Sequence, residues 1–275
     1  MTTVLAALGT LAMSVQEGPR CDLALIPREA AIRPGGTFQV ALRFKIESGW
    51  HIYWQNPGDS GVATNVDWKV PAGFKTLKTD WSRPHRFEVG GVVSYGFEDT
   101  AYIIGTFRAP SKISSKSVRF HVDSDWLICK ESCIMGKGGA GMEIPVDSEA
   151  AATAKNPNQW RDIIGSLPAS SPLPLSAKTT PGYYEIAIKA PNSGLKSPTE
   201  AYFYAVRTDV ADHAKPQVLT RAAEGWVLRI PRSSYEKAPA KVLEGVLELG
   251  LGEAQNSAYN IRIPITNATT TRRQS

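Results

Sequence analysis

The sequence predicts an all-β protein of two immunoglobulin-like β-sandwich domains joined by a short helical linker. Three observations predict this class. Residues 37–46 (TFQVALRFKI) alternate between apolar and polar side chains, as a strand with one buried face does. Short apolar stretches separated by turns recur along a chain that holds 23 Gly and 19 Pro among its 275 residues. After a Pro/Ser-rich stretch that ends near residue 180, the strand pattern begins again.

We place the first domain at residues 21–147. The alternating stretches predict strands at residues 21–28, 37–46, 50–55, 65–70, 89–95, 101–108 and 117–122. Residues 56–61 (NPGDSG) are expected to form a loop, because Asn, Pro, Gly and Asp favour turns.

Residues 148–180 are expected to form a helical and Pro/Ser-rich linker. Its apolar residues recur at helical spacing: Trp160, Ile163, Ile164 and Leu167. We place a second, smaller β-sandwich at residues 181–267. Strands are expected in it at residues 183–190, 201–208, 225–232, 242–250 and 258–265. This domain has no cysteine and reads as a spacer or docking module.

The two ends of the chain differ from its body. Residues 1–20 are expected to be a signal peptide or a disordered N-terminus, because their apolar run suits a signal peptide and is too short to span a bilayer. Residues 268–275 are expected to be a disordered tail. The net charge of +5 is scattered along the chain, which excludes an obvious nucleic-acid-binding surface. We therefore expect a periplasmic or secreted protein with no membrane span in its mature part.

Two of the three cysteines, Cys129 and Cys133, lie four residues apart. If the strand before them runs through Ile128, then residues 130–132 (KES) form a three-residue hairpin loop. The two cysteines would then face each other across an antiparallel pair, with Cα atoms about 4.5–5.5 Å apart, which a disulfide accepts. In a straight strand they would lie about 13 Å apart.

The cysteine pair has three possible roles. Closing a five-residue ring stabilises a fold by only about 2 kcal/mol, which favours a bond that opens and closes, with Trp126 as an apolar wall beside the sulfurs. A structural clip is the second possibility. The third is a soft copper(I) site formed by Cys129, Cys133 and Met135 or a histidine.

Three motifs in the same order resemble the N-terminal periplasmic domain of DsbD- and ScsB-like thiol–disulfide reductases. Along the chain they are GWHIYWQNPGDSG (49–61), GGVVSYGFED (90–99) and WLICKESCIMG (126–136). The narrow cysteine spacing is closer to the ScsB-like branch, and the membrane and thioredoxin-like domains of the full-length relatives have no counterpart in this sequence. The resemblance implies an immunoglobulin-like fold and a Cys129/Cys133 pair that passes electrons from a membrane thiol reductase to thioredoxin-like periplasmic proteins. It also implies that Tyr95, Gly96 and Phe97 form a cap that shields the cysteines.

Other chemistry finds little support in the sequence. The histidines show no metal-ligand spacing, and His51 with its aromatic neighbours is expected to belong to the core. Cys21 is the odd cysteine, either a free thiol or a partner in an intermolecular bond. No nucleophile elbow, P-loop or zinc-protease motif is present. We expect an electron carrier with no cofactor, and whether it acts as an enzyme in its own right is left open.

Overall fold

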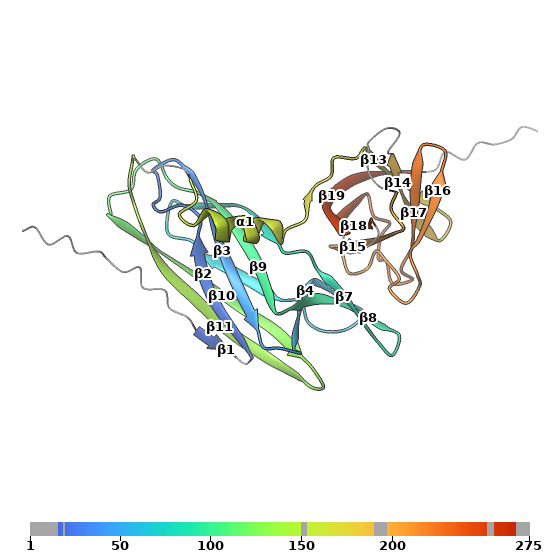
Figure 1. Cartoon of the computed structure of the whole chain (residues 1–275), viewed down its shortest axis with the longest axis horizontal. Helices are drawn as coiled ribbons and strands as arrows, with labels where there is room; N and C mark the ends of the chain where they lie inside the picture. The colour runs from blue at the N-terminus through green and yellow to red at the C-terminus, as the bar shows by residue number, and fades with distance from the viewer. Residues whose placement is uncertain (1–15, 19, 150–152, 190–196, 252–255, 268–275) are drawn as a thin grey trace, which may run out of the picture. The chain divides into compact units, whose positions relative to one another are not determined.

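The protein is described here from a computed structural model (Figure 1). It describes residues 16–18, 20–149, 153–189, 197–251 and 256–267. Apart from the helix α1, the elements of these residues are strands. The predicted all-β class is therefore confirmed. The expected signal segment lies largely outside the described residues, as does the expected C-terminal tail, residues 268–275.

The first sheet is antiparallel and has the strand order β1-β2-β3-β9-β6. Its strands are β1 (Gln16–Gly18), β2 (Cys21–Pro27), β3 (Thr37–Ile46), β6 (Lys75–Trp81) and β9 (Thr100–Arg108). Strand β3 has the bounds that its alternation predicts, and its even-numbered residues are buried. Strand β6 was not predicted, because its side chains are mostly exposed and carry no alternating pattern.

The second sheet has the order β11-β10-β4-β8-β7, with β5 also paired to β10. Its strands are β4 (His51–Gly58), β5 (Asn65–Lys69), β7 (His85–Val89), β8 (Val92–Glu98), β10 (Ser117–Cys129) and β11 (Cys133–Pro145). Strands β10 and β11 form one long hairpin in unbroken register from Ser117↔Pro145 to Cys129↔Cys133.

Contacts divide the chain into two compact units, and the division passes through β4 and β8. The first unit holds Met1–Ile52, Thr64–Ser82 and Glu98–Ser166. The second holds Tyr53–Ala63, Arg83–Phe97 and Leu167–Ser275. The domain boundaries expected from the sequence stay a prediction.

Aromatic rings fill the core of the first unit. The Phe38 ring on β3 meets Phe120 on β10 edge to face, with ring centres 5.3 Å apart. Further along the same two strands, Phe44 and Trp126 make a second edge-to-face contact at 5.8 Å. Such pairs add to the free energy gained by burial. The residues of β10 that face this core are the even-numbered ones, which leaves its odd-numbered residues on the other face.

The expected loop at residues 56–61 is wrong in part, because β4 continues to Gly58. Asn56 is fully buried, and its side-chain amide donates a hydrogen bond to the Ala205 carbonyl at 2.7 Å. Its Oδ1 accepts a hydrogen bond from the Gly58 N–H at 3.0 Å. These hydrogen bonds satisfy the polar side chain of a buried Asn. The preference of Asn for exposed turns does not predict such a position.

The expected strand at residues 89–95 is also wrong in part: residues 92–95 belong to β8, but the chain turns at residues 90 and 91. Gly90 and Gly91 have positive φ angles of 61° and 81° and form the two-residue turn between β7 and β8. Glycine adopts these angles without steric cost, and a Gly-Gly pair suits the turn type that tight hairpins require.

The expected linker helix is present as α1 (Pro157–Gly165). Trp160 and Ile163 are buried, and the Trp160 indole N–H donates a hydrogen bond to the Pro27 carbonyl on β2 at 3.0 Å. Ile164, which the sequence grouped with them, is 46% exposed.

A third sheet has the order β15-β18-β19-β13-β14-β17-β16, with β12 also paired to β19. Its strands are β12 (Ala169–Ser170), β13 (Leu175–Thr180), β14 (Tyr183–Lys189), β15 (Glu200–Ala205), β16 (Val218–Ala222), β17 (Gly225–Pro231), β18 (Val242–Gly250) and β19 (Asn256–Asn267). All five expected strands are present. Strands β13 and β16 were missed, because β13 lies in the Pro/Ser-rich stretch and β16 is mostly exposed.

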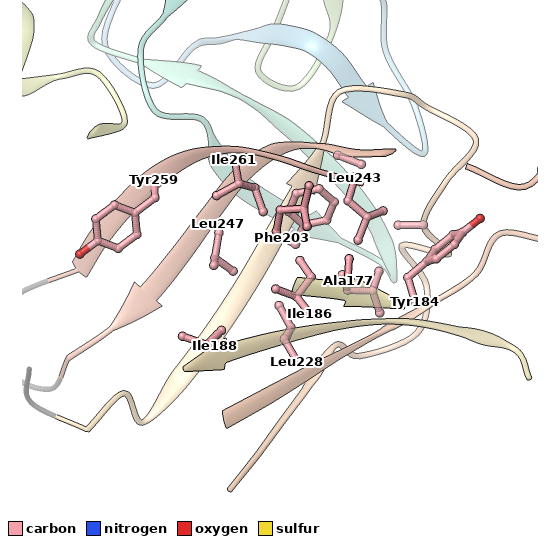
Figure 2. Packing of buried hydrophobic residues seen from close by; sticks show 14 of the residues in the cluster. Ala177, Tyr184, Ile186, Ile188, Phe203, Leu228, Leu243, Leu247, Tyr259 and Ile261 are labelled. Atoms are coloured by element: carbon pink, nitrogen blue, oxygen red, sulfur yellow. The ribbon is translucent and has the colours of Figure 1, made fainter. Parts of the chain in front are cut away.

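Strand β19 connects the two halves of this sheet. Its residues 256–264 pair with β18, and its last residues pair in parallel with β13. Apolar side chains of the two halves face each other across the core that results (Figure 2). Strand β15 stands at one end of the sheet order. There the Gln217 side chain accepts a hydrogen bond from the Phe203 N–H and donates one to the Phe203 carbonyl, each at 2.9 Å.

Candidate functional site

The cysteine pair closes the β10–β11 hairpin, as the sequence predicts. Cys129 ends β10, Cys133 begins β11, and the two are register partners. The loop between them is closed by a hydrogen bond from the Lys130 N–H to the Ser132 carbonyl at 3.1 Å. The two sulfurs form a disulfide, with Cα atoms 4.2 Å apart.

The two sulfur-bearing residues differ in exposure. Cys129 is only 3% exposed, whereas Cys133 is exposed. The residues after Cys133 carry apolar side chains outward, since Ile134 is 38% and Met135 is 58% exposed. An incoming thiol therefore finds Cys133 within reach and an apolar surface beside it.

Trp126 is fully buried on the core face of β10. Its indole lies over Gly136, its register partner on β11, where an added Cβ would come within 2.4 Å of the ring. Because side chains alternate along a strand, Trp126 and Cys129 belong to opposite faces of β10. The structure does not bring the indole to the sulfurs' face, and its shielding role stays a prediction.

The expected cap residues Tyr95, Gly96 and Phe97 lie on β8 and are buried. The Tyr95 hydroxyl forms a hydrogen bond with that of Tyr202 at 2.7 Å, and its ring contacts the Tyr204 ring with centres 5.0 Å apart. Burial raises the pKa of Tyr95 well above its usual value, so this phenol stays protonated. These contacts are all within the second unit, and a role of the three residues as a cap over the cysteines stays a prediction.

His51 is the residue that the sequence reasoning missed. It begins β4, and its register partner on β10 is Cys129. Burial lowers its pKa, and the nearby charge of Glu98 partly opposes this effect. No local pattern could have placed His51 beside the cysteine, because the two residues are brought together by strand pairing between distant parts of the sequence.

The other histidines are placed elsewhere. His213 is buried in the second unit, with its Nδ1 2.9 Å from the Asp59 carboxylate. His121 lies on β10 near the Asp123 carboxylate, with its side chain 42% exposed. His85 is exposed at the start of β7.

The third cysteine, Cys21, is a free thiol on β2 and is only 2% exposed. Burial raises its pKa to about 12, and the charge of Asp22 adds to this effect. Since the thiolate is the reactive form of cysteine, Cys21 is inert at neutral pH.

The donor set for a metal is small. Among the described residues, no group of three or more His, Cys, Asp or Glu side chains is arranged to hold a metal ion. Met135 stands two residues after Cys133 on β11, so both belong to the same face of the strand. In the part of the chain that the structure describes, no helix has the length and apolar character needed to cross a membrane.

Residues 23–139 match the family model described as Thiol:disulfide interchange protein DsbD, N-terminal. The fold is similar to the crystal structure of the N-terminal periplasmic domain of ScsB from Proteus mirabilis. That likeness has a TM-score of 0.61 at 14% identity and covers 93% of this chain and 99% of that one. A structure of mouse clustered PcdhgC3 EC1-3 covers 84% of this chain and 77% of its own at 8% identity. Its TM-score of 0.17 indicates no shared overall fold. No curated protein matches this sequence.

Proposed function

We propose, from the premise that residues 23–139 form a DsbD/ScsB-like N-terminal domain, that this protein is a thiol–disulfide exchange module. Cys129 and Cys133 would carry its electrons. One observation carries the proposal: the disulfide closes a hairpin loop of three residues and keeps one of its two sulfur-bearing residues exposed. The family match over the same hairpin supports it.

The small ring supports a bond that opens. A disulfide stabilises a protein mainly by restricting the unfolded chain, and a five-residue ring contributes about 2 kcal/mol. The register of β10 and β11 persists through twelve further residue pairs below the cysteines, from Ser117↔Pro145 to Ile128↔Ile134. These twelve residue pairs hold the two strands together when the disulfide is reduced.

The difference in exposure supports one assignment of roles to the two sulfurs. A partner thiolate attacks Cys133 Sγ, a mixed disulfide forms there, and the electron pair of the broken bond leaves on Cys129 Sγ, which takes up a proton. In the opposite direction, the Cys129 thiolate attacks Cys133 Sγ and releases the partner thiol. Cys133 is thus the contact with the partner, and Cys129 is the resolving cysteine.

The family match supports a setting for this exchange. We place the protein in the periplasm or outside the cell, where disulfides persist. Its partners would be a membrane thiol reductase on one side and thioredoxin-like proteins on the other. The solved ScsB domain that shares its fold is named as periplasmic, which supports this placement.

The reduction potential of the Cys129–Cys133 bond tests the proposal. The purified protein is equilibrated against glutathione buffers, and its free thiols are alkylated and counted by mass. A midpoint between about −120 and −270 mV, the range of known exchange proteins, is expected. A midpoint below about −300 mV is typical of a structural disulfide and would contradict the proposal.

A copper(I) site is the second candidate, favoured by the position of Met135 on the same face of β11 as Cys133. Two thiolates and a thioether are soft ligands of the kind that copper(I) prefers. Copper(I) titration of the reduced protein against a chelator tests it. Tight one-to-one uptake that is lost in Met135→Leu would favour the metal site, and weak uptake unchanged by that substitution would exclude it.

A further inference from the structure

His51 stands in line with the two cysteines across three neighbouring strands. The sheet order is β11-β10-β4, and the register pairs Cys133 with Cys129 and Cys129 with His51. Directly opposed residues of an antiparallel pair project to the same face, with Cβ atoms about 4.5–5.5 Å apart. The side chains of His51 and Cys129 therefore leave the sheet on the same face from neighbouring positions, within the first unit.

We infer that His51 is the proton acceptor and donor for Cys129 during thiol–disulfide exchange. This inference rests on the proposed function, because a structural clip has no need of proton transfer. It adds a third residue to the two sulfurs and assigns it to the buried one.

Cys129 needs such a group because it is buried. Only the thiolate attacks a disulfide, and an apolar environment disfavours it. Cys21 shows the consequence within the same protein. Its register partners are Gly18 and Ile46, which offer no base, and burial raises its pKa to about 12. Cys129 is as buried as Cys21 and differs from it in having a histidine opposite.

His51 is suited to both directions of transfer. Its lowered pKa keeps the ring neutral at pH 7, so a ring nitrogen is able to accept a proton. Glu98, the last residue of the neighbouring strand β8, favours the imidazolium once it forms. Lys130 and Glu131 of the hairpin loop beside Cys129 are charged as well; both are exposed and they have opposite signs. On the other side of His51, the Arg20 guanidinium lies over the Trp50 ring and pairs with Glu47. The Lys130 ammonium group lies against Gly49, two residues before His51; its Nζ would be 3.2 Å from a Cβ atom built on that glycine.

The balanced step is closure of the mixed disulfide. The Cys129 thiol gives its proton to His51, and the resulting thiolate attacks Cys133 Sγ. The bond between Cys133 and the partner breaks, its electron pair leaves on the partner sulfur, and the partner thiolate takes a proton from water. The arrangement follows the general pattern of an activated cysteine, in which a base lies beside the nucleophile and a carboxylate supports the base.

The test separates closure from attack by using glutathione disulfide as the probe. The full chain is reduced, mixed with excess glutathione disulfide, quenched with acid at set times and weighed by mass spectrometry. Addition of one glutathione to Cys133 depends on the probe concentration. Closure, which releases that glutathione, does not. Both rates are measured from pH 5 to pH 9 for the wild type, for His51→Gln and for the matched control His121→Gln on β10.

In the wild type, closure should rise with pH through the pKa of His51, below its ordinary value, and then level off. In His51→Gln it should be slower at pH 7 by roughly 100-fold, the lower end of the usual contribution of a general base. Its rise should then continue to higher pH, because the buried thiol must lose its proton to hydroxide in solution without the help of a base. The addition step should be unchanged, which shows that the variant is folded, and His121→Gln should match the wild type throughout.

Closure in His51→Gln at the wild-type rate and with the wild-type pH profile would overturn the inference and leave the exchange function standing. A wild type that takes up no glutathione would overturn both. If His51→Gln fails in the addition step, Glu98→Gln decides the matter, since Glu98 is exposed. Loss of its charge should lower the pKa of His51 and move the rise in closure to lower pH, and an unmoved rise would overturn the inference.

Discussion

The hairpins β10–β11 and β7–β8 reverse the chain by different means. The β7–β8 turn uses two glycines with positive φ, a property of the backbone that does not change. The β10–β11 turn uses a three-residue loop whose ends are joined by a disulfide. Both tips carry exposed apolar side chains, Val89 and Val92 on one and Ile134 and Met135 on the other. Of these two hairpins, the cysteine hairpin is therefore the one whose turn is held by a bond that reduction can break.

The largest expected effect concerns the two cysteines of the disulfide. Cys129→Ser leaves the exposed Cys133, which should form a lasting mixed disulfide with glutathione. Cys133→Ser leaves Cys129, which should react at least about tenfold more slowly, because the residue is buried and an apolar environment disfavours the reactive thiolate. Mass spectrometry of both variants after the same exposure measures this. Equal modification would remove the distinction between an attacked and a resolving sulfur.

The next effect tests how the cysteine hairpin is packed below its loop. Gly136→Ala places a Cβ against the Trp126 indole, and overpacking of this kind costs about 1–3 kcal/mol. Gly165→Ala is the control, because a Cβ there would meet nothing within 4 Å. Urea unfolding measures both. A Gly136→Ala variant as stable as the wild type would mean that the indole is free to move away.

Reduction of the disulfide should have a moderate effect. Because the ring has five residues, the free energy of unfolding should fall by about 2 kcal/mol. Urea unfolding with and without dithiothreitol measures the difference, with Cys129→Ser as a reference that dithiothreitol does not change. A loss above about 4 kcal/mol would instead indicate a structural staple.

The smallest expected effect belongs to the permanent turn. Gly90→Ala forces a side chain into the left-handed region, at a cost of about 1 kcal/mol. Gly90→Asn should cost less, because Asn tolerates that region better. The space around Gly90 is open, so the comparison isolates backbone strain. If the two variants unfold at the same urea concentration, the positive φ is not what shapes the turn.

Local patterns predicted the parts of this protein that local forces determine. The alternation of residues 37–46 gave β3 its bounds, and the spacing of Cys129 and Cys133 predicted their hairpin, since a bridge over four residues requires a turn. Strands β6 and β16 escaped because their side chains are mostly exposed, so no apolar period marks them. The Gly90–Gly91 turn was hidden in an apolar stretch that looks continuous in sequence.

The candidate site shows the same limit. His51 and Cys129 are register partners although they lie far apart in the sequence. Which strand pairs with β10 depends on the packing of the whole sheet. The unequal exposure of Cys129 and Cys133 depends likewise on what covers each end of the hairpin. The sequence alone identified the sulfurs, and the roles proposed for them rest on the fold.

The Gln217 side chain bears on how this protein behaves at high concentration. Its amide binds the N–H and the carbonyl of Phe203 at the end of a sheet, as a residue of one more strand would. An exposed strand edge is a template on which other chains polymerise, and proteins suppress this by covering it. Any chain that adds to β15 at Phe203 must first displace both bonds. The Gln217 side chain thus covers the backbone of Phe203 at the edge of β15 without adding a strand to the sheet.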